Sequence, residues 1–159
     1  MDILEGGQKI AVSATLIQWD RLGLDPVAAI KNSVAKVKQR FEPHVGPPRT
    51  EPVAVVAFGP SLRDTWQELR NYRVIFTCSG AHKFLVERGV IPTYHIESDP
   101  QAHKPWMLGT PQQDTTYVIA STCHPTYFDL LEQYKVKVLL WHLLFTEPEL
   151  FALLPSREW

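Results

Sequence analysis

The sequence predicts an α/β protein with a Rossmann-like open, mainly parallel sheet and helices on both faces, preceded by an N-terminal helical arm. The first observation is that short β-branched and apolar runs alternate with amphipathic segments from residue 53 onward. Such alternation is the sequence pattern of strands and helices. The second observation is that the connections between these segments are short. Together they indicate parallel strands joined by right-handed crossovers.

The N-terminal third is predicted to form a separate arm. Residues 1–24 are mixed in character and are left unassigned. Asp25 and Pro26 have the chemistry of an N-cap and a first helical residue, and apolar residues three and four apart predict a helix over about 26–41. The proline-dense stretch 42–52 is typical of a linker. We therefore expect an arm and linker over 1–51 and a Rossmann-like domain over 52–159.

The main domain is predicted to contain five strands, at 53–58, 73–78, 93–98, 117–121 and 135–141. Helices are expected over 62–70 and 81–88, after Pro125, and after a capping-box pattern at 146–149. In open sheets of this kind, ligands bind outside the carboxyl ends of the strands. Four of these ends are rich in small polar or ionisable residues, at 59–61, 78–80, 97–99 and 121–124.

The first strand end, Gly59-Pro60-Ser61, has the composition of an anion-binding turn. Gly59 lets a ligand approach the backbone, Pro60 is tolerated in a first helical turn, and Ser61 can cap the helix that follows. Ser79 and Gly80 form a similar small-residue turn after the second strand, where Ser79 is a second possible cap. An anion such as a phosphate is the ligand that such turns suit.

Asp99 is the candidate for metal or ribose binding. His95, Glu97 and Asp99 alternate along the third strand, so they share one face and Asp99 lies nearest the predicted crevice. A carboxylate there can hold a Mg²⁺ ion that bridges phosphates, or accept a ribose hydroxyl. The alternative is that Asp99 and Pro100 only form a turn, because Asp before Pro is common in turns.

His124 is the second candidate catalytic residue. It follows the fourth strand and precedes Pro125 at the start of a helix. From there it can donate to a leaving phosphate or act as a general acid. The alternative is an ordinary loop histidine. His103 and Lys104, just beyond Asp99, can be cationic clamps in a loop over the crevice or plain surface residues. Trp106, in the same loop, can stack on a base or ring.

The sequence argues against several classes of function. It contains no GxGxxG after the first strand and no GxxxxGK[ST], which disfavours classical dinucleotide binding and P-loop chemistry. A net charge of -1 offers no field for general nucleic-acid binding. No apolar run is long enough for a membrane span, and the first residues lack a basic signal-peptide region. With two distant cysteines, a cytoplasmic setting is expected. The oligomeric state stays open, a homo-oligomer included.

The motifs resemble those of the MptE-like family, which includes the archaeal 6-hydroxymethyl-dihydropterin diphosphokinase and the bacterial motility accessory factors. The resemblance covers about Val53 to Trp141. It rests on the GPSL turn at 59–62, the small residues at 79–80, the helix ending at 85–92, and the strand closing on Asp99-Pro100. Family members continue into a further glycine-rich turn and a strand ending in Gly-x-Asp. This chain stops before such a segment, so we expect the domain to be incomplete at its C-terminal end.

The resemblance implies a Rossmann-like fold and nucleotide-dependent transfer. The leading hypothesis is pyrophosphoryl transfer from ATP, and the alternative is transfer of a sugar from a CMP-activated donor. By this resemblance Gly59, Ser61, Ser79 and Asp99 line the nucleotide site. A third hypothesis is a non-catalytic binding or assembly module with the same fold.

Overall fold

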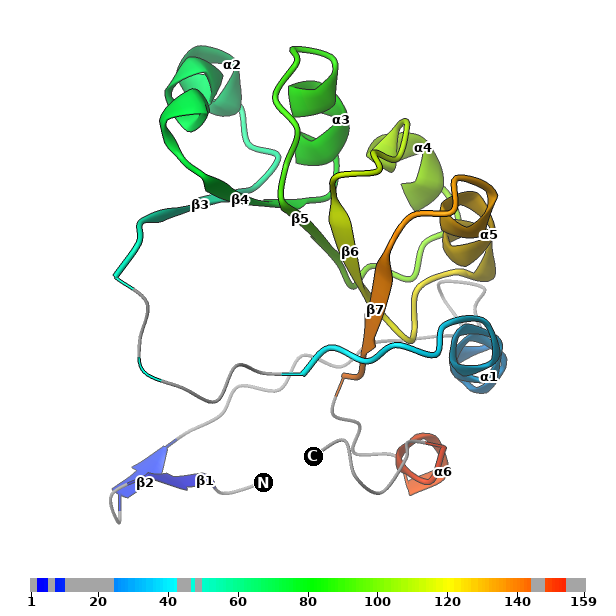
Figure 1. The fold of residues 1–159 in the computed structure, drawn as a ribbon. Helices are drawn as coiled ribbons and strands as arrows, with labels where there is room; N and C mark the ends of the chain where they lie inside the picture. The colour runs from blue at the N-terminus through cyan, green and yellow to red at the C-terminus, as the bar shows by residue number, and fades with distance from the viewer. Residues whose placement is uncertain are drawn as a thin grey trace.

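Five parallel strands form the sheet on which the domain is built (Figure 1). The computed structural model describes residues 3–5, 8–10, 25–42, 47, 50–143 and 148–153. Neighbouring strands follow one another in sequence order, and all four pairings are parallel. The predicted α/β class with an open parallel sheet is therefore confirmed. The strands are β3 (Val53–Val56), β4 (Val74–Cys78), β5 (Tyr94–Glu97), β6 (Thr116–Ala120) and β7 (Val138–Trp141).

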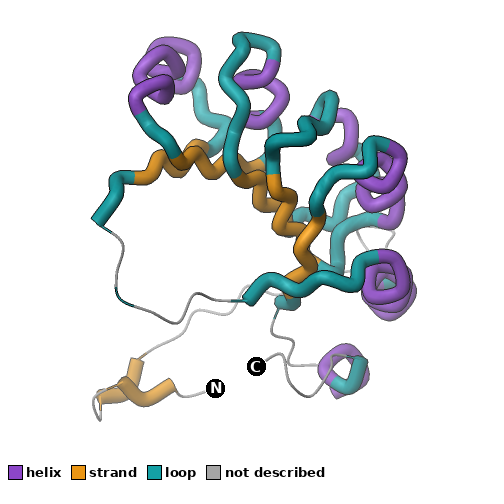
Figure 2. Tube along the Cα trace, viewed as in Figure 1, coloured by secondary structure: helices purple, strands orange, loops and turns teal. Residues whose placement is uncertain are grey.

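Helices alternate with these strands along the chain (Figure 2). After β3 comes α2 (Leu62–Thr65), which tightens into the 3₁₀ helix η2 (Trp66–Asn71), so the single helix predicted over 62–70 is two short ones. The helix after β4 is α3 (Ala81–Val86), and the one after β6 is α5 (Pro125–Gln133). The short helix α4 (Lys104–Leu108), between β5 and β6, is absent from the predicted elements.

The helices do not flank the sheet on both faces as expected. Figure 1 shows α2, α3, α4 and α5 in one row on the same side of the curved sheet. The physical reason is the strand order, because right-handed crossovers between successive neighbours all return over the same face. Only one face of β3 is therefore covered. Ala54 and Val56 are buried on the helix side, whereas Val53 and Val55 on the other face are 48% and 80% exposed.

The helix α1 (Pro26–Lys36) begins as predicted and ends earlier. The Asp25 carboxylate accepts hydrogen bonds from the N–H groups of Val27 and Ala28, which confirms the N-cap. The helix stops at Lys36 rather than near residue 41 because Val37 has extended dihedrals. The chain then lies beside β7, where the Phe41 N–H donates to the Leu140 carbonyl at 2.8 Å.

The arm is thus in contact with the sheet domain, since α1 also packs against α5. The division at residues 51 and 52 stays a prediction. Near the termini, β1 (Ile3–Glu5) and β2 (Gln8–Ile10) form an antiparallel pair, and α6 (Pro148–Phe151) is the last helix of the described residues. The first two positions of the predicted capping box, at 146–147, lie outside the described residues. No helix in the described part of the chain is long and apolar enough to cross a membrane.

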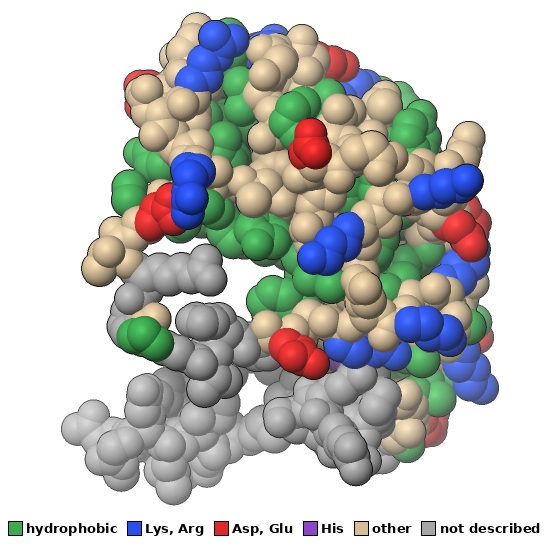
Figure 3. Space-filling model, viewed as in Figure 1, with side chains coloured by type: hydrophobic (Ala, Val, Ile, Leu, Met, Phe, Trp, Pro, Cys, Tyr) green, Lys and Arg blue, Asp and Glu red, His purple; other side chains and the backbone are tan. Residues whose placement is uncertain are grey.

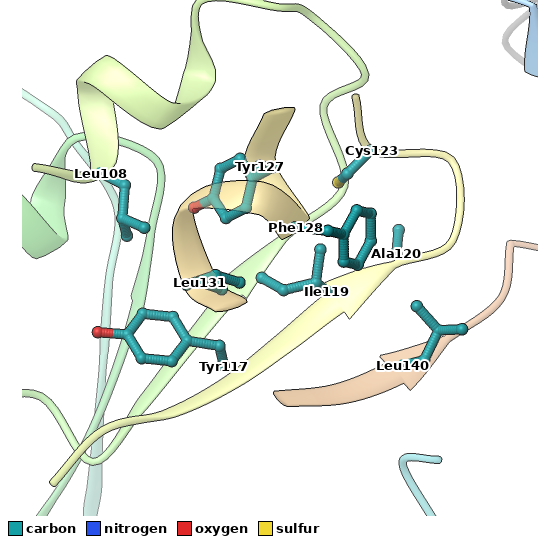
Figure 4. Packing of buried hydrophobic residues seen from close by; sticks show 9 residues of the cluster. All are labelled: Leu108, Tyr117, Ile119, Ala120, Cys123, Tyr127, Phe128, Leu131 and Leu140. Atoms are coloured by element: carbon teal, nitrogen blue, oxygen red, sulfur yellow. The ribbon is translucent and has the colours of Figure 1, made fainter. Parts of the chain in front are cut away.

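Among the described residues, the largest buried apolar cluster lies between β6 and α5 (Figure 4). Amphipathic spacing on α5 turns Tyr127, Phe128 and Leu131 toward the sheet, where they meet Ile119 of β6. Burial of this apolar surface fixes the helix on the strand and so fixes the β6 end that precedes His124. The buried members are Leu108, Tyr117, Ile119, Ala120, Cys123, Tyr127, Phe128, Leu131 and Leu140.

Candidate functional site

The turn after β3 is open on its outer side. A Cβ built on Gly59 would meet no atom within 4 Å, so a ligand can approach this backbone closely. Ser61 is exposed and makes no capping hydrogen bond, contrary to the expected cap. The N–H groups of Leu62 and Arg63 bond to the carbonyls of Gly59 and Pro60 within the turn. With α2 only four residues long, the turn offers access rather than a strong helix dipole.

The turn after β4 is strained at Ser79, whose φ is +52°. Non-glycine residues adopt this left-handed conformation at a cost of about 1 kcal/mol or more. Ser79 does not cap α3, and its hydroxyl instead lies 3.2 Å from the Lys104 amine, which donates to it. Gly80 is buried, and a Cβ there would lie 2.9 Å from the ring of Phe58. The ends of β3 and β4 are therefore in direct contact.

The end of β5 carries an ion cluster formed by Glu97, Asp99 and Lys104. The Lys104 amine lies 2.9 Å from the Asp99 carboxylate and 3.9 Å from that of Glu97. Glu97 also accepts hydrogen bonds from the N–H groups of Ser98 and Asp99, both at 3.0 Å. The sequence offered Lys104 as a loop clamp or a surface residue, whereas the structure buries it between two carboxylates.

Lys104 stabilises the charged form of Asp99. Burial alone would raise the pKa of Asp99, yet the hydrogen bonds from Lys104 and from Gln101 outweigh it and leave this pKa below its ordinary value. Asp99 is thus a carboxylate at neutral pH, with about a quarter of its side chain exposed. The alternative role of Asp99, as a turn residue, also has support. The Gln101 N–H donates to the Asp99 carboxylate at 3.0 Å, as an Asp turn requires.

His124 is the N-cap of α5, and the structure does not join it to the ion cluster by any described hydrogen bond or ion pair. Its Nδ1 accepts from the Thr126 N–H at 3.3 Å and lies 2.8 Å from the Thr126 hydroxyl. A ring nitrogen that accepts a hydrogen bond carries no proton, so the proton is on Nε2. His124 can therefore donate from Nε2 while its other nitrogen starts the helix.

A network of buried hydrogen bonds joins β4, β5 and α5 next to the ion cluster. His95, two residues before Glu97 on the same face of β5, is fully buried, and its Nε2 lies 2.9 Å from the Tyr127 hydroxyl. Its Nδ1 lies 3.1 Å from the Thr77 hydroxyl on β4. The alternation along β5 predicted the shared face, but nothing in the sequence indicated that the ring has partners on both sides.

The site is contiguous across three strand ends. Phe58 touches Gly80, Ser79 bonds to Lys104, and Lys104 pairs with Asp99. Within the described part of the chain, no three His, Cys, Asp or Glu side chains gather as a metal-ligand set. Acidic and basic side chains are interspersed over the face shown in Figure 3, in keeping with the near-neutral net charge.

An open parallel sheet with a polar cluster at the carboxyl ends of its strands defines a Rossmann-like α/β protein, and ligands of such proteins bind at that edge. A family model described as 6-hydroxymethylpterin diphosphokinase MptE-like matches residues 26–149. This chain belongs to the MptE-like family, and the resemblance seen in its motifs is confirmed. No curated protein and no solved structure matches the chain.

Proposed function

We propose that this protein is a nucleotide-dependent transferase that moves a pyrophosphoryl group from ATP to a hydroxyl group. The observation that carries the proposal is the contiguous row of Phe58, Gly80, Ser79, Lys104 and Asp99 at the ligand-binding edge of the sheet. The description of the matched family, a 6-hydroxymethylpterin diphosphokinase, suggests the same reaction.

In this reaction the acceptor oxygen attacks the β-phosphorus of ATP. The new O–P bond forms as the bond between the β-phosphorus and the oxygen it shares with the α-phosphate breaks, so AMP leaves and the hydroxyl proton passes to water. Such transfer depends mainly on positioning and charge neutralisation. Gly59, Pro60 and Ser61 would admit the phosphates, with Ser79 and Gly80 as the adjoining wall. His124 would donate from Nε2 to the leaving phosphate.

Asp99 is the residue that we propose for Mg²⁺. Magnesium is often held by one or two carboxylates together with substrate phosphates and water. Asp99 and Glu97 supply two carboxylates at one strand end, which fits an ion carried in on the nucleotide better than a permanently held one. The ion would supply positive charge to the phosphates. Lys104 holds both carboxylates in place and adds a positive charge beside them.

Binding measurements test the proposal. ATP and CTP are titrated into the protein by calorimetry, with and without Mg²⁺, beside the variants Asp99→Asn and Asp114→Asn. Asp114 is an exposed residue that precedes β6, at the opposite edge of the sheet. We expect Mg²⁺-dependent ATP binding that falls about tenfold in Asp99→Asn and is unchanged in Asp114→Asn. Absence of nucleotide binding refutes the proposal, and unchanged affinity in Asp99→Asn assigns Asp99 to the turn. Preference for CTP favours the CMP-sugar alternative.

A non-catalytic binding module is the second candidate, and one observation favours it. The Asp99 carboxylate is already paired with Lys104 at 2.9 Å, so a metal ion must compete with an amine that is in place. Incubation with ATP and 6-hydroxymethylpterin, followed by separation of AMP, distinguishes the two. AMP formation that depends on the acceptor supports transfer, whereas nucleotide binding without AMP formation supports the module.

A further inference from the structure

Two exposed aromatic side chains lie next to the Gly59 turn. Phe58 and Trp106 are 54% and 74% exposed, although burial of such rings is strongly favourable. Phe58 follows β3 and Trp106 lies in α4, yet both line one hollow of about 200 Å³. Phe84 and Met107 complete its apolar walls. The hollow thus offers flat apolar surfaces at the ligand-binding edge of the sheet.

Positive charge accompanies these rings. The Lys83 amine lies 4.8 Å from the centre of the Trp106 ring, and the Arg88 guanidinium lies 3.5 Å from that of Phe84. Cations at these distances are attracted to the ring electrons. They also hold the aromatic side chains in place, which lowers the entropy lost when a ligand binds.

A second hollow, of about 630 Å³, adjoins the first. It shares Phe58, Phe84 and Glu87 with the first hollow, and its own walls include Gly59 and Arg63. Arginine is well suited to phosphate, because its planar group donates two parallel hydrogen bonds. One hollow therefore suits a ring and its neighbour suits phosphates. Glu87, in the walls of both, can accept hydrogen bonds from the N–H edge of a nitrogen heterocycle.

We propose that the hollow between Phe58, Phe84 and Trp106 is a subsite for a planar nitrogen heterocycle whose phosphate-bearing part reaches the Gly59 turn. This inference rests on the proposed transferase function and assigns the part of that site that holds a ring. Two sources supply such a ring in the proposed reaction, the base of the nucleotide and the ring of the acceptor. Their shared chemistry is a flat aromatic surface with N–H groups at its edge.

Binding of two separate probes tests the subsite. Pterin, followed by its fluorescence anisotropy, represents the acceptor ring, and ATP, followed by calorimetry, represents the base. The variants are Trp106→Ala and, as a matched control, Tyr72→Ala, which removes a ring that is 38% exposed just before β4, at the opposite edge. Loss of one stacking partner is expected to weaken binding roughly fivefold or more. Circular dichroism confirms that each variant is folded.

A third variant tests the hollow without removal of a ring. In Gly80→Ala the added Cβ would lie 2.9 Å from the Phe58 ring, which must then move. We expect Gly80→Ala to weaken binding of the same probe whose binding Trp106→Ala weakens. Trp106→Phe, which retains a flat ring, is expected to keep most of the affinity.

The outcomes distinguish failure of the ring subsite from failure of the proposed transferase function. Weaker pterin binding in Trp106→Ala assigns the acceptor ring to the hollow, and weaker ATP binding assigns the base. If neither probe binds the unaltered protein, or if both bind Trp106→Ala and Gly80→Ala as they bind the unaltered protein, the subsite is refuted. An equal loss in Tyr72→Ala refutes it as well. Pterin binding that depends on Trp106 in a protein without affinity for ATP or CTP upholds the subsite and refutes the proposed transferase.

Discussion

Mild acid should destabilise this protein, because two buried histidines are built into its core as neutral rings. His82 is fully buried, with Nδ1 2.8 Å from the Leu108 carbonyl and Nε2 3.0 Å from the Tyr117 hydroxyl. A carbonyl can only accept, so Nδ1 carries the proton and Nε2 accepts from Tyr117. The Gln112 N–H donates to the same hydroxyl at 2.7 Å. Both ring nitrogens of His82 and the Tyr117 hydroxyl therefore have hydrogen-bond partners while His82 is neutral.

The size of the effect follows from the pKa of His82, which burial lowers from 6.5 to about 4 and which the bond to Leu108 raises only in part. Between these values the unfolded chain binds a proton that the folded chain does not, so the free energy of unfolding falls as the pH falls from 6.5 toward 4. At about 1.36 kcal/mol per pKa unit, His82 alone contributes a loss of about 3 kcal/mol. Burial also places the pKa of His95 well below its ordinary value, which acts in the same direction.

Urea denaturation followed by tryptophan fluorescence measures this loss. We expect the free energy of unfolding to be about 2–3 kcal/mol or more lower at about pH 4.5 than at about pH 7.5. His82→Gln, whose side chain does not titrate, should show a smaller difference, and His103→Gln, at an exposed position, should match the unaltered protein. The lowered pKa of Asp99 matters only below its ordinary value of 3.8, outside this window. Equal stability of the unaltered protein at both pH values would refute the reasoning.

Three further predictions concern single side chains. Asp25→Ala removes the N-cap of α1 and should lower the free energy of unfolding by about 1 kcal/mol in urea titrations. Ser33→Ala removes a buried hydroxyl within 3.0 Å of the Ser121 carbonyl, and the same assay should show a loss of about 1–2 kcal/mol, whereas no loss would mean that water replaces the bond. Burial raises the pKa of both thiols, and Cys123 is fully buried whereas Cys78 is half-buried. A thiol reagent should therefore modify Cys78 slowly in the native protein and Cys123 only on unfolding, and Cys78→Ser should abolish the slow phase.

The strands were predictable because each has a local signature. Runs such as 53–56 and 74–78 combine β-branched residues with a following turn, and both form strands. The positions of the helices relative to the sheet had no such signature. Helices lie on both faces only where the strand order reverses, and alternation of strands and helices is equally compatible with a sequential order. The order depends on which strands pair, and that depends on contacts between segments distant in sequence.

The candidate site could also be predicted only in part from the sequence. Topology placed Ser79 and Asp99 at one edge of the sheet, and the structure joins them through Lys104. The role of Lys104 was not visible, because a lysine in a polar loop is normally solvated. Its burial depends on the short helix α4, which has too few residues for a helical periodicity, and on Glu97, which lies on the helix-covered face of β5.

The core and the site are coupled through β5. His95 and Glu97 are two residues apart on the same face of this strand, and both are buried. Besides burial and the neighbouring His82, the charge of Lys104 lowers the pKa of His95. The Lys104 amine therefore stabilises Asp99 as a carboxylate and His95 as a neutral ring at once. His95 also bonds to Tyr127 of α5, so β5 and the residues that follow it carry both a core hydrogen bond and the carboxylates of the candidate site. The edge of the sheet that carries the candidate site is thus linked to the core through His95, the second of the two buried histidines that we expect to make the fold sensitive to acid.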